Sequence, residues 1–239
     1  MKSLKITIVF CAFLFLLFLS CSGNPKRDKD GYFSEEKFVD SLNAGKKRKT
    51  KVEFEKFRHT GNGDVFVSIK FYKSEKKWIK GEKTDIDIWR LTNSFKFDKD
   101  GVTGLDVQIS DFNNDGFNDI TYQSAIAGRG GNIVMTLFVY DPDNKDFIHI
   151  KNSESYPNLT YNEKLHCINS LILTGSTTTV FLTIKKDALE EFARVDVSDK
   201  IVVEEKGGDG KFRVVEEKPF KGNDEDFYKT FKNYKPLEY

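Results

Sequence analysis

Oxygen-bearing residues recur between positions 111 and 119 at a spacing that suits a hard cation. The stretch reads Asp-Phe-Asn-Asn-Asp-Gly-Phe-Asn-Asp, with oxygen-bearing side chains at relative positions 1, 3, 5 and 9 and glycine at 6. Gly116 permits the sharp turn, and the residue at position 7 can offer its backbone carbonyl. The sequence therefore predicts a Ca²⁺ site, with the ligands Asp111, Asn113, Asp115, Phe117 and Asp119.

This loop differs from an EF-hand. Position 12 is Tyr122 instead of a bidentate glutamate, and the residues that follow the loop, 120–122, resemble a strand rather than a helix. Calcium takes about six to eight oxygens, so waters or other loops are needed to complete its shell. The alternative interpretation is an Asx-rich turn that binds no metal.

The N-terminus resembles a bacterial lipoprotein signal. A basic start is followed by an apolar run over residues 6–19, which is shorter than the roughly 20 residues of a membrane span, and then by Ser20-Cys21. From this pattern we expect residues 1–20 to be a signal peptide and Cys21 to carry lipid. Two or more acyl chains on Cys21 would anchor the protein stably to a membrane. The alternatives are an ordinary signal peptide with a chance cysteine, or an uncleaved anchor.

The remaining chain then divides simply. Residues 21–33 are a polar, lipidated tether, and residues 34–239 are a single β-rich domain that contains the calcium loop. Ser22 follows the lipidated cysteine where an aspartate would favour retention in the inner membrane, so we expect a cell-envelope protein of the outer membrane. The mature chain keeps one internal cysteine, Cys167. A catalytic cysteine would need a base nearby, but its neighbour His166 would face the other side of a strand. We therefore expect Cys167 to be a buried structural thiol.

Composition favours a β structure. The chain has 38 basic and 37 acidic residues, a balance that does not call for nucleic acid as a partner. It also has 22 phenylalanines, nine tyrosines and only five prolines. The run of basic residues at 46–49 is expected to be a solvated loop, with contact to anionic lipid or peptidoglycan as the alternative.

Periodicity predicts the elements. Ser34 can cap a short N-terminal helix with Phe38, Val39 and Leu42 on one side and Gly45 at its end. From Thr50 the apolar residues alternate with period two, which predicts strands. The expected strands include those around residues 52–57, 65–71, 78–79, 86–89, 105–109, 133–140, 147–150, 165–168, 179–184, 192–197, 201–203 and 212–215, and a last short helix begins at Asn223. The predicted fold is a mainly β, antiparallel sandwich-like domain with a short N-terminal helix.

The aspartate loop resembles the calcium loop of FG-GAP or VCBS propeller repeats, but a propeller would need several copies. The larger arrangement continues with a glycine-rich loop, an apolar strand ending at Tyr140-Asp141-Pro142, a return strand and Tyr156-Pro157-Asn158-Leu159. That order, over about residues 100–200, is similar to the periplasmic inhibitors of invertebrate-type lysozyme and to related immunity lipoproteins.

The resemblance implies a calcium-binding β-sandwich in which a Gly/Ser-rich loop beside the calcium site plugs a hydrolase cleft. The corresponding partner-binding residues here are Gly128, Arg129, Gly130, Gly131 and Asn132, without the serine or tyrosine of the family loop. Arg129 could pair with the carboxylates that cleave glycosidic bonds. The alternative interpretation of this segment is a plain glycine-rich hairpin between two strands.

Three functional hypotheses follow. The first is a non-enzymatic, calcium-stabilised lipoprotein that binds and inhibits a lysozyme-like peptidoglycan hydrolase. The second is a structural or adhesive surface lipoprotein whose calcium loop only braces the fold. An enzyme is the least favoured, because His59, His149 and His166 show no metal-ligand spacing and the sequence has no Gly-x-Ser-x-Gly motif or phosphate-binding loop.

Overall fold

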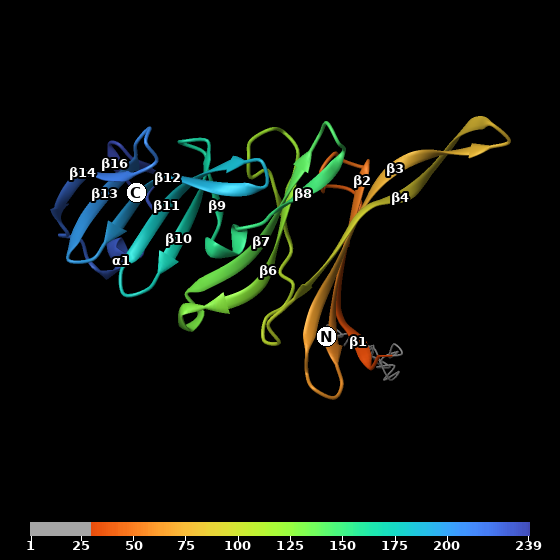
Figure 1. Ribbon diagram of the computed structural model, residues 1–239, viewed down its shortest axis with the longest axis horizontal. Coiled ribbons are helices and arrows are strands. Elements are labelled where there is room, and N and C mark those ends of the chain that lie inside the picture. The colour runs from red at the N-terminus through yellow and green to blue at the C-terminus, as the bar shows by residue number, and fades with distance from the viewer. Residues whose placement is uncertain (1–29) are drawn as a thin grey trace, which may run out of the picture.

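The computed structural model describes residues 30–239, which form a stack of antiparallel sheets (Figure 1). The first sheet has the strand order β1-β2-β3-β4. Its strands are β1 (Tyr32–Asp40), β2 (Thr50–His59), β3 (Val65–Ile79) and β4 (Glu82–Asp98). Alternate apolar residues of β2 and β3, such as Phe54 and Ile69, are fully buried on one face, as expected for a half-buried antiparallel sheet.

The second sheet has the order β5-β6-β7-β8. Its strands are β5 (Gln108–Ser110), β6 (Asp119–Ala127), β7 (Asn132–Asp141) and β8 (Asp146–Ile150), and the 3₁₀ turn η1 (Gly128–Gly130) joins β6 to β7. Strand β7 contains the most apolar run of the described chain, and the strand predicted over 133–140 is confirmed. Its residues from Met135 to Tyr140 are all buried, so neither face of this strand meets solvent.

The third sheet has the order β14-β13-β12-β11-β10-β9. It follows η2 (Ser153–Ser155) and comprises β9 (Thr160–Asn162), β10 (Cys167–Leu173), β11 (Thr177–Lys185), β12 (Ala188–Val197), β13 (Lys200–Lys206) and β14 (Phe212–Pro219). The C-terminal segment adds α1 (Asp224–Phe227), β15 (Asn233–Tyr234) and β16 (Leu237–Glu238). The helix predicted at Asn223 is confirmed, and Asn223 and Asp226 form a capping box.

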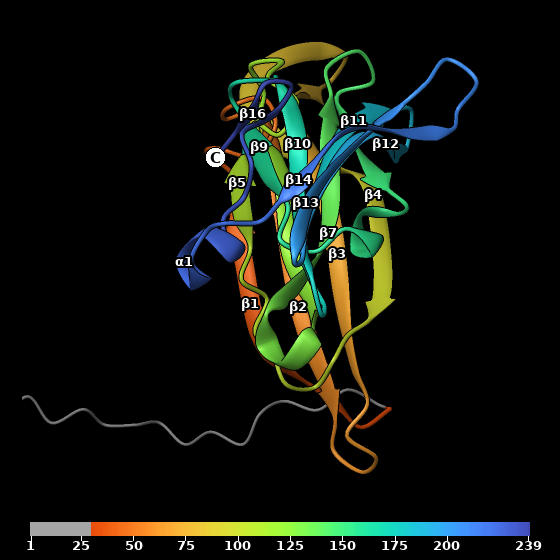
Figure 2. The ribbon, with the colours of Figure 1, turned by 90° about the vertical axis from the view of Figure 1, so that its left-hand side faces the viewer.

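Three hydrophobic cores join these layers in chain order. The first lies between the first and second sheets and includes Phe54 and Phe138. The second lies between the second and third sheets and includes Leu137 and Leu182. The third lies between the outer face of the third sheet and the C-terminal segment, around Phe231. Figure 2 looks along this stack, with the sheets one behind another. The predicted mainly β, antiparallel, sandwich-like fold is confirmed.

The predicted short N-terminal helix is wrong. Its residues form β1, which pairs antiparallel with β2 from Tyr32↔His59 to Asp40↔Val52. Pairing with β2 satisfies the backbone and packs Phe38 against the first core, and such tertiary contacts override a weak local helix preference. The strand ends at a turn in which Asp40 Oδ1 accepts hydrogen bonds from the amides of Asn43 and Ala44, both at 2.8 Å.

Strands β3 and β4 continue past the second sheet as a projecting two-stranded ribbon (Figure 1). They pair almost without interruption from Phe66↔Asp98 to Ile79↔Glu82. The turn residues Lys80 and Gly81 have φ values of 52° and 83°, which identifies the two-residue hairpin turn. The sequence pattern predicts only short separate strands near 78–79 and 86–89, because the polar residues between them conceal the continuous pairing.

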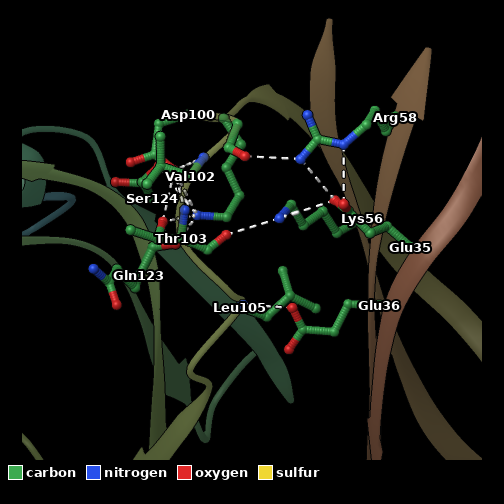
Figure 3. A network of polar contacts seen from close by, with 12 residues as sticks. Glu35, Glu36, Lys56, Arg58, Asp100, Val102, Thr103, Leu105, Gln123 and Ser124 are labelled. Carbon is green, nitrogen blue, oxygen red and sulfur yellow. Dashed lines mark hydrogen bonds and ion pairs between the residues drawn. The ribbon is translucent and has the colours of Figure 1, made fainter. Parts of the chain in front are cut away.

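A buried lysine joins the first sheet to the second (Figure 3). The Lys99 side chain is fully buried. Its Nζ donates to the carbonyl of Gln123 in β6 at 2.7 Å and to Thr103 Oγ1 at 2.6 Å. Burial lowers the pKa of Lys99, and these acceptors, with Asp100 Oδ1 at 3.4 Å, hold the ammonium group in place.

A second group of charged side chains, from β1 and β2, holds the segment between β4 and β5 from its other side (Figure 3). Lys56 Nζ lies 2.9 Å from Glu35 Oε2 and donates to the carbonyl of Thr103 at 2.8 Å. Arg58 donates to Glu35 at 2.9 Å and to the carbonyl of Gly101 at 2.7 Å. Residues 99–105, which carry the chain from one sheet to the next, are therefore held by charged side chains on both sides.

Asp100 gives this network a defined acid sensitivity. Burial alone would raise the pKa of Asp100, but hydrogen bonds from Thr103 and the charge of Lys99 outweigh it and lower the pKa to about 2. A carboxyl whose pKa is lower in the folded state than in the unfolded state, where it is about 3.9, stabilises the fold above that value. This contribution disappears as the pH falls toward 2.

Between about pH 4 and pH 2, we therefore expect the free energy of unfolding to fall by about 2 kcal/mol less in Asp100→Asn than in the native protein. The measurement is the free energy of unfolding by denaturant at a series of pH values. The control is Asp143→Asn, in an exposed turn, which should leave the profile unchanged. An equally steep acid loss in Asp100→Asn would contradict the role given to Asp100.

Candidate functional site

The aspartate loop, residues 111–119, connects β5 to β6 at one end of the second sheet. Two of its residues lie in the left-handed backbone region, Asn114 at φ 58° and Gly116 at φ 87°. No atom lies within 4 Å of the position that a Cβ on Gly116 would occupy. The glycine is therefore required by its backbone conformation and not by lack of space.

The polar side chains of the loop turn inward toward its own backbone. Asp111 accepts hydrogen bonds from the amides of Asp115 at 3.2 Å and Gly116 at 2.9 Å. Asn113 Oδ1 accepts from the amide of Asp115 at 3.1 Å, and Asp115 Oδ1 accepts from the amide of Phe117 at 2.8 Å. This arrangement places the side-chain oxygens of the predicted ligands Asp111, Asn113 and Asp115 around one turn. It is also the pattern of successive Asx turns.

Asp119, the predicted ligand at position 9, is fully buried. Its two oxygens accept hydrogen bonds from the amides of Phe112 at 2.8 Å and Tyr140 at 2.9 Å. Burial raises the pKa of Asp119 to about 7; the two amides oppose the rise, and the negative charges of Asp115 and Asp111 add to it. Asp119 thus fastens the loop to β7, close enough to Asp115 and Asp111 for their negative charges to act on it.

Within residues 30–239, no three His, Cys, Asp or Glu side chains form a group that could hold a metal ion by themselves. The predicted calcium set relies on two other donors, the Asn113 amide oxygen and the Phe117 backbone carbonyl. The Phe117 ring packs 5.3 Å from the Tyr140 ring, so this residue also attaches the loop to the first core.

The aspartate loop also contacts the turn between β1 and β2. The amide of Gly45 donates to the carbonyl of Asn118 at 2.8 Å, and Asn118 Nδ2 donates to the carbonyl of Asn43 at 3.0 Å. An added Cβ on Gly45 would lie 2.6 Å from the Tyr140 ring, so a glycine is needed for this close approach. The exposed basic run 46–49 consequently begins directly beside the aspartate loop.

The glycine-rich loop occupies the opposite end of β6. Its central residues, Gly128, Arg129 and Gly130, have φ values of 56°, 57° and 96°, so all three adopt the left-handed backbone region that glycine tolerates best. All three are exposed. An added Cβ on Gly128 would lie 2.5 Å from Asn132 Nδ2, so the first glycine is also required by close packing.

Asn132 supports this loop from within and does not itself reach the surface. It is buried, its Nδ2 donates to the carbonyl of Leu173 at 2.7 Å, and its Oδ1 accepts from the amide of Leu173 at 2.9 Å. Asn158 donates to the carbonyl of Gly131 at 3.0 Å. The side chains of Asn132 and Asn158 thus fix the base of the loop to β10.

Two exposed isoleucines flank the glycine-rich loop. Ile126 and Ile133 are partners in the β6–β7 register, and 42% and 40% of their surfaces are exposed. Together with the exposed Arg129 they form a small projection with an apolar base and a cationic tip. The sequence pattern identified the loop but not this isoleucine pair, whose side chains would ordinarily be assigned to a strand core.

The two loops lie apart, in contrast to the arrangement that the resemblance to lysozyme inhibitors implies. The aspartate loop ends at the first residue of β6 and the glycine-rich loop follows the last residue of β6. A strand of nine residues spans roughly 30 Å. In this chain the predicted calcium ligands and the predicted partner-binding residues are therefore at opposite ends of one strand.

The prediction that Cys167 is a buried thiol is confirmed. Burial raises the pKa of Cys167 to about 11, which leaves the thiol protonated and a poor nucleophile near neutral pH. Its neighbour His166 faces elsewhere, with Nδ1 2.9 Å from the Tyr161 hydroxyl. His149 packs among Phe95, Phe97 and Phe138 in the first core region.

The predicted signal peptide and the lipidated Cys21 lie outside the described residues. Within residues 30–239, no helix has the length and apolar character needed to cross a membrane.

No protein-family model matches the chain, and no curated protein matches it. Among solved structures, the chain is similar to one described as "Structure of a Xanthomonas Type IV Secretion System related protein". The two share 14% sequence identity and a TM-score of 0.43, over 81% of this chain and 97% of that chain.

Proposed function

We propose that this protein is a non-enzymatic, calcium-stabilised lipoprotein of the bacterial cell envelope that binds and inhibits a lysozyme-like peptidoglycan hydrolase. The observation that carries the proposal is the projection formed by the glycine-rich loop. Arg129 is exposed at its tip, and Asn132 and Asn158 brace its base against β10. A cationic tip held on a rigid base suits insertion into a cleft lined by carboxylates.

The physical basis is preorganisation. The brace fixes the loop before binding, so less conformational entropy is lost in the complex. Glycosidases place two carboxyl groups on either side of the scissile bond, and a guanidinium can donate two parallel hydrogen bonds to a carboxylate. Ile126 and Ile133 add apolar surface that would exclude water around the Arg129 ion pair.

The calcium part of the proposal rests on Asp111 and Asp115, whose oxygens accept hydrogen bonds within one turn, and on Asp119, whose buried carboxylate feels their negative charges. A bound cation would offset their mutual repulsion, and Asn113 and the Phe117 carbonyl supply donors of the neutral oxygen type that calcium accepts. The ion would strengthen the loop that Asp119 fastens to β7.

A second candidate is a structural or adhesive surface lipoprotein. It is favoured by the separation of the two loops along β6 and by the bracing role of Asp119 between Phe112 and Tyr140. In that case a calcium ion stabilises the fold and takes no part in contact with a partner.

For calcium, we expect Ca²⁺ at about a hundredfold excess over its Kd to stabilise the protein by about 2–3 kcal/mol and to raise Tm by about 5–10 °C. Asp115→Ala should abolish this rise because it removes one carboxylate ligand. Asp143→Ala, in an exposed turn, is the matched control. Thermal unfolding with Ca²⁺ and with EDTA measures the effect, and identical Tm values in the two would refute calcium binding.

For inhibition, we expect the purified protein with Ca²⁺ to inhibit at least one of the chicken-, goose- and invertebrate-type lysozymes. Arg129→Ala should weaken inhibition about 30-fold or more, because a buried arginine anchor in an interface contributes about 2 kcal/mol or more. Gly130→Trp should also abolish it by blocking close approach. Arg213→Ala, exposed on the β13–β14 hairpin, should have no effect.

The inhibition constant for each lysozyme class provides the measurement. Inhibition that Arg129→Ala and Gly130→Trp leave intact would exclude the glycine-rich loop as the cleft plug. Absence of inhibition of every class would make the structural or adhesive lipoprotein the leading interpretation.

For the anchor, we expect Cys21→Ala to release the protein from the membrane fraction, because the acyl chains are lost with the thiol. Cell fractionation followed by immunoblotting measures the distribution. Cys11→Ala, inside the predicted signal peptide, serves as the control and should leave the protein in the membrane fraction. If Cys21→Ala remains with the membranes, lipidation at this residue is not the anchor.

A further inference from the structure

The β3–β4 ribbon presents a run of apolar side chains that nothing in the described chain covers. Its exposed large residues are Trp78 (66% exposed), Ile79 (44%), Ile88 (43%), Trp89 (40%) and Leu91 (49%). Isolated exposed apolar residues are ordinary, but several gathered on one projecting arm mark an interaction site. The chain contains two tryptophans, and both lie on this ribbon.

The base of the ribbon lies beside the basic run 46–49. The amide of Ser74 donates to the carbonyl of Lys49 at 2.8 Å, which brings the exposed run 46–49 against β3. A hollow of about 610 Å³ lies there, lined by Lys49, Ser74, Glu75, Lys76, Trp78 and Asp87. Cationic and aromatic groups therefore share one surface, although the two segments are far apart in sequence.

The charge of this surface differs from that of the whole chain. Residues 46–49 carry four positive charges and no negative ones, and residues 72–91 carry six basic against four acidic residues. The whole chain carries a net charge of only +1. Some of the ribbon charges are paired, as in Lys76 with Asp87 at 3.4 Å, so the positive excess of this surface comes mainly from residues 46–49.

We propose that the ribbon and the basic run 46–49 together form a docking surface for the anionic surface of a lipid bilayer. Tryptophan prefers the boundary between headgroups and acyl chains. Basic residues near an anionic surface each add attraction that extends over about a Debye length. A ribbon with exposed tryptophans beside a basic run satisfies both requirements at once, as in interfacial membrane binding by amphipathic segments.

This contact is separate from the predicted lipid anchor. The described chain enters the first sheet at Tyr32, which pairs with His59 beside the β2–β3 turn. The ribbon tip, at Lys80-Gly81, lies at the far end of the 15-residue strand β3, roughly 50 Å away. The proposal depends neither on lipidation of Cys21 nor on inhibition by the glycine-rich loop.

Tryptophan fluorescence tests the proposal directly, because all tryptophan emission comes from the ribbon. The full chain is combined with vesicles of phosphatidylcholine alone or of phosphatidylcholine mixed with phosphatidylglycerol. We expect a blue shift, and quenching by brominated lipid, only with the anionic vesicles, and reversal of both by high salt. Trp89→Phe leaves Trp78 as the single reporter and should show the same response.

Two charge variants distinguish this surface from general attraction. In the double variant Lys46→Gln/Lys47→Gln, the ratio of vesicle-bound to free protein should fall about tenfold or more. The double variant Lys211→Gln/Lys221→Gln loses the same charge from two exposed positions, one in the β13–β14 turn and one after β14, and should behave as the native chain.

Three results would overturn the proposal. They are identical emission in neutral and anionic vesicles, equal weakening by the two double variants, and a blue shift that grows with protein concentration in the absence of vesicles. The last result would identify a second copy of the chain as the occupant of the ribbon.

Discussion

The structure depends on a second sheet that is buried on both faces. Along β7, Leu137 and Val139 point into the second core, whereas Phe138 and Tyr140 point into the first. A strand in that position must carry apolar residues without alternation, and close packing on both sides leaves it little freedom to move. The aspartate loop and the glycine-rich loop are attached to the two ends of its neighbour β6, so each begins from a rigid support.

This constraint explains which parts of the fold the sequence could predict. The continuous apolar run at 133–140 marked a fully buried strand, and the aspartate spacing marked the loop before β6. Strand β1 was missed because its capping serine and spaced apolar residues resemble a helix when read alone, and pairing with β2 decides its conformation. The role of Asn132 was also hidden, because its partner Leu173 lies 41 residues away.

The candidate surfaces differ in how firmly the fold holds them. Asn132 and Asn158 brace the glycine-rich loop, and Asp119 fastens the aspartate loop to β7. Where the ribbon projects from the first sheet, it is held only by the hydrogen bonds between β3 and β4. An isolated two-stranded ribbon is marginally stable in water. Periodicity predicts that both tryptophans lie in ordinary strands. Only the β3–β4 register shows that they lie outside the hydrophobic cores and are exposed.

The order of the three cores along the chain has a consequence for biosynthesis. The first core draws on residues from Ala44 to Phe147, the second on residues from Phe112 to Leu189, and the third on residues from Cys167 to Phe231. A nascent chain can therefore close its first core early, but one face of the middle sheet stays bare until the strands up to β12 emerge. That apolar face is the surface that a chaperone would have to shield while the polypeptide is being synthesised.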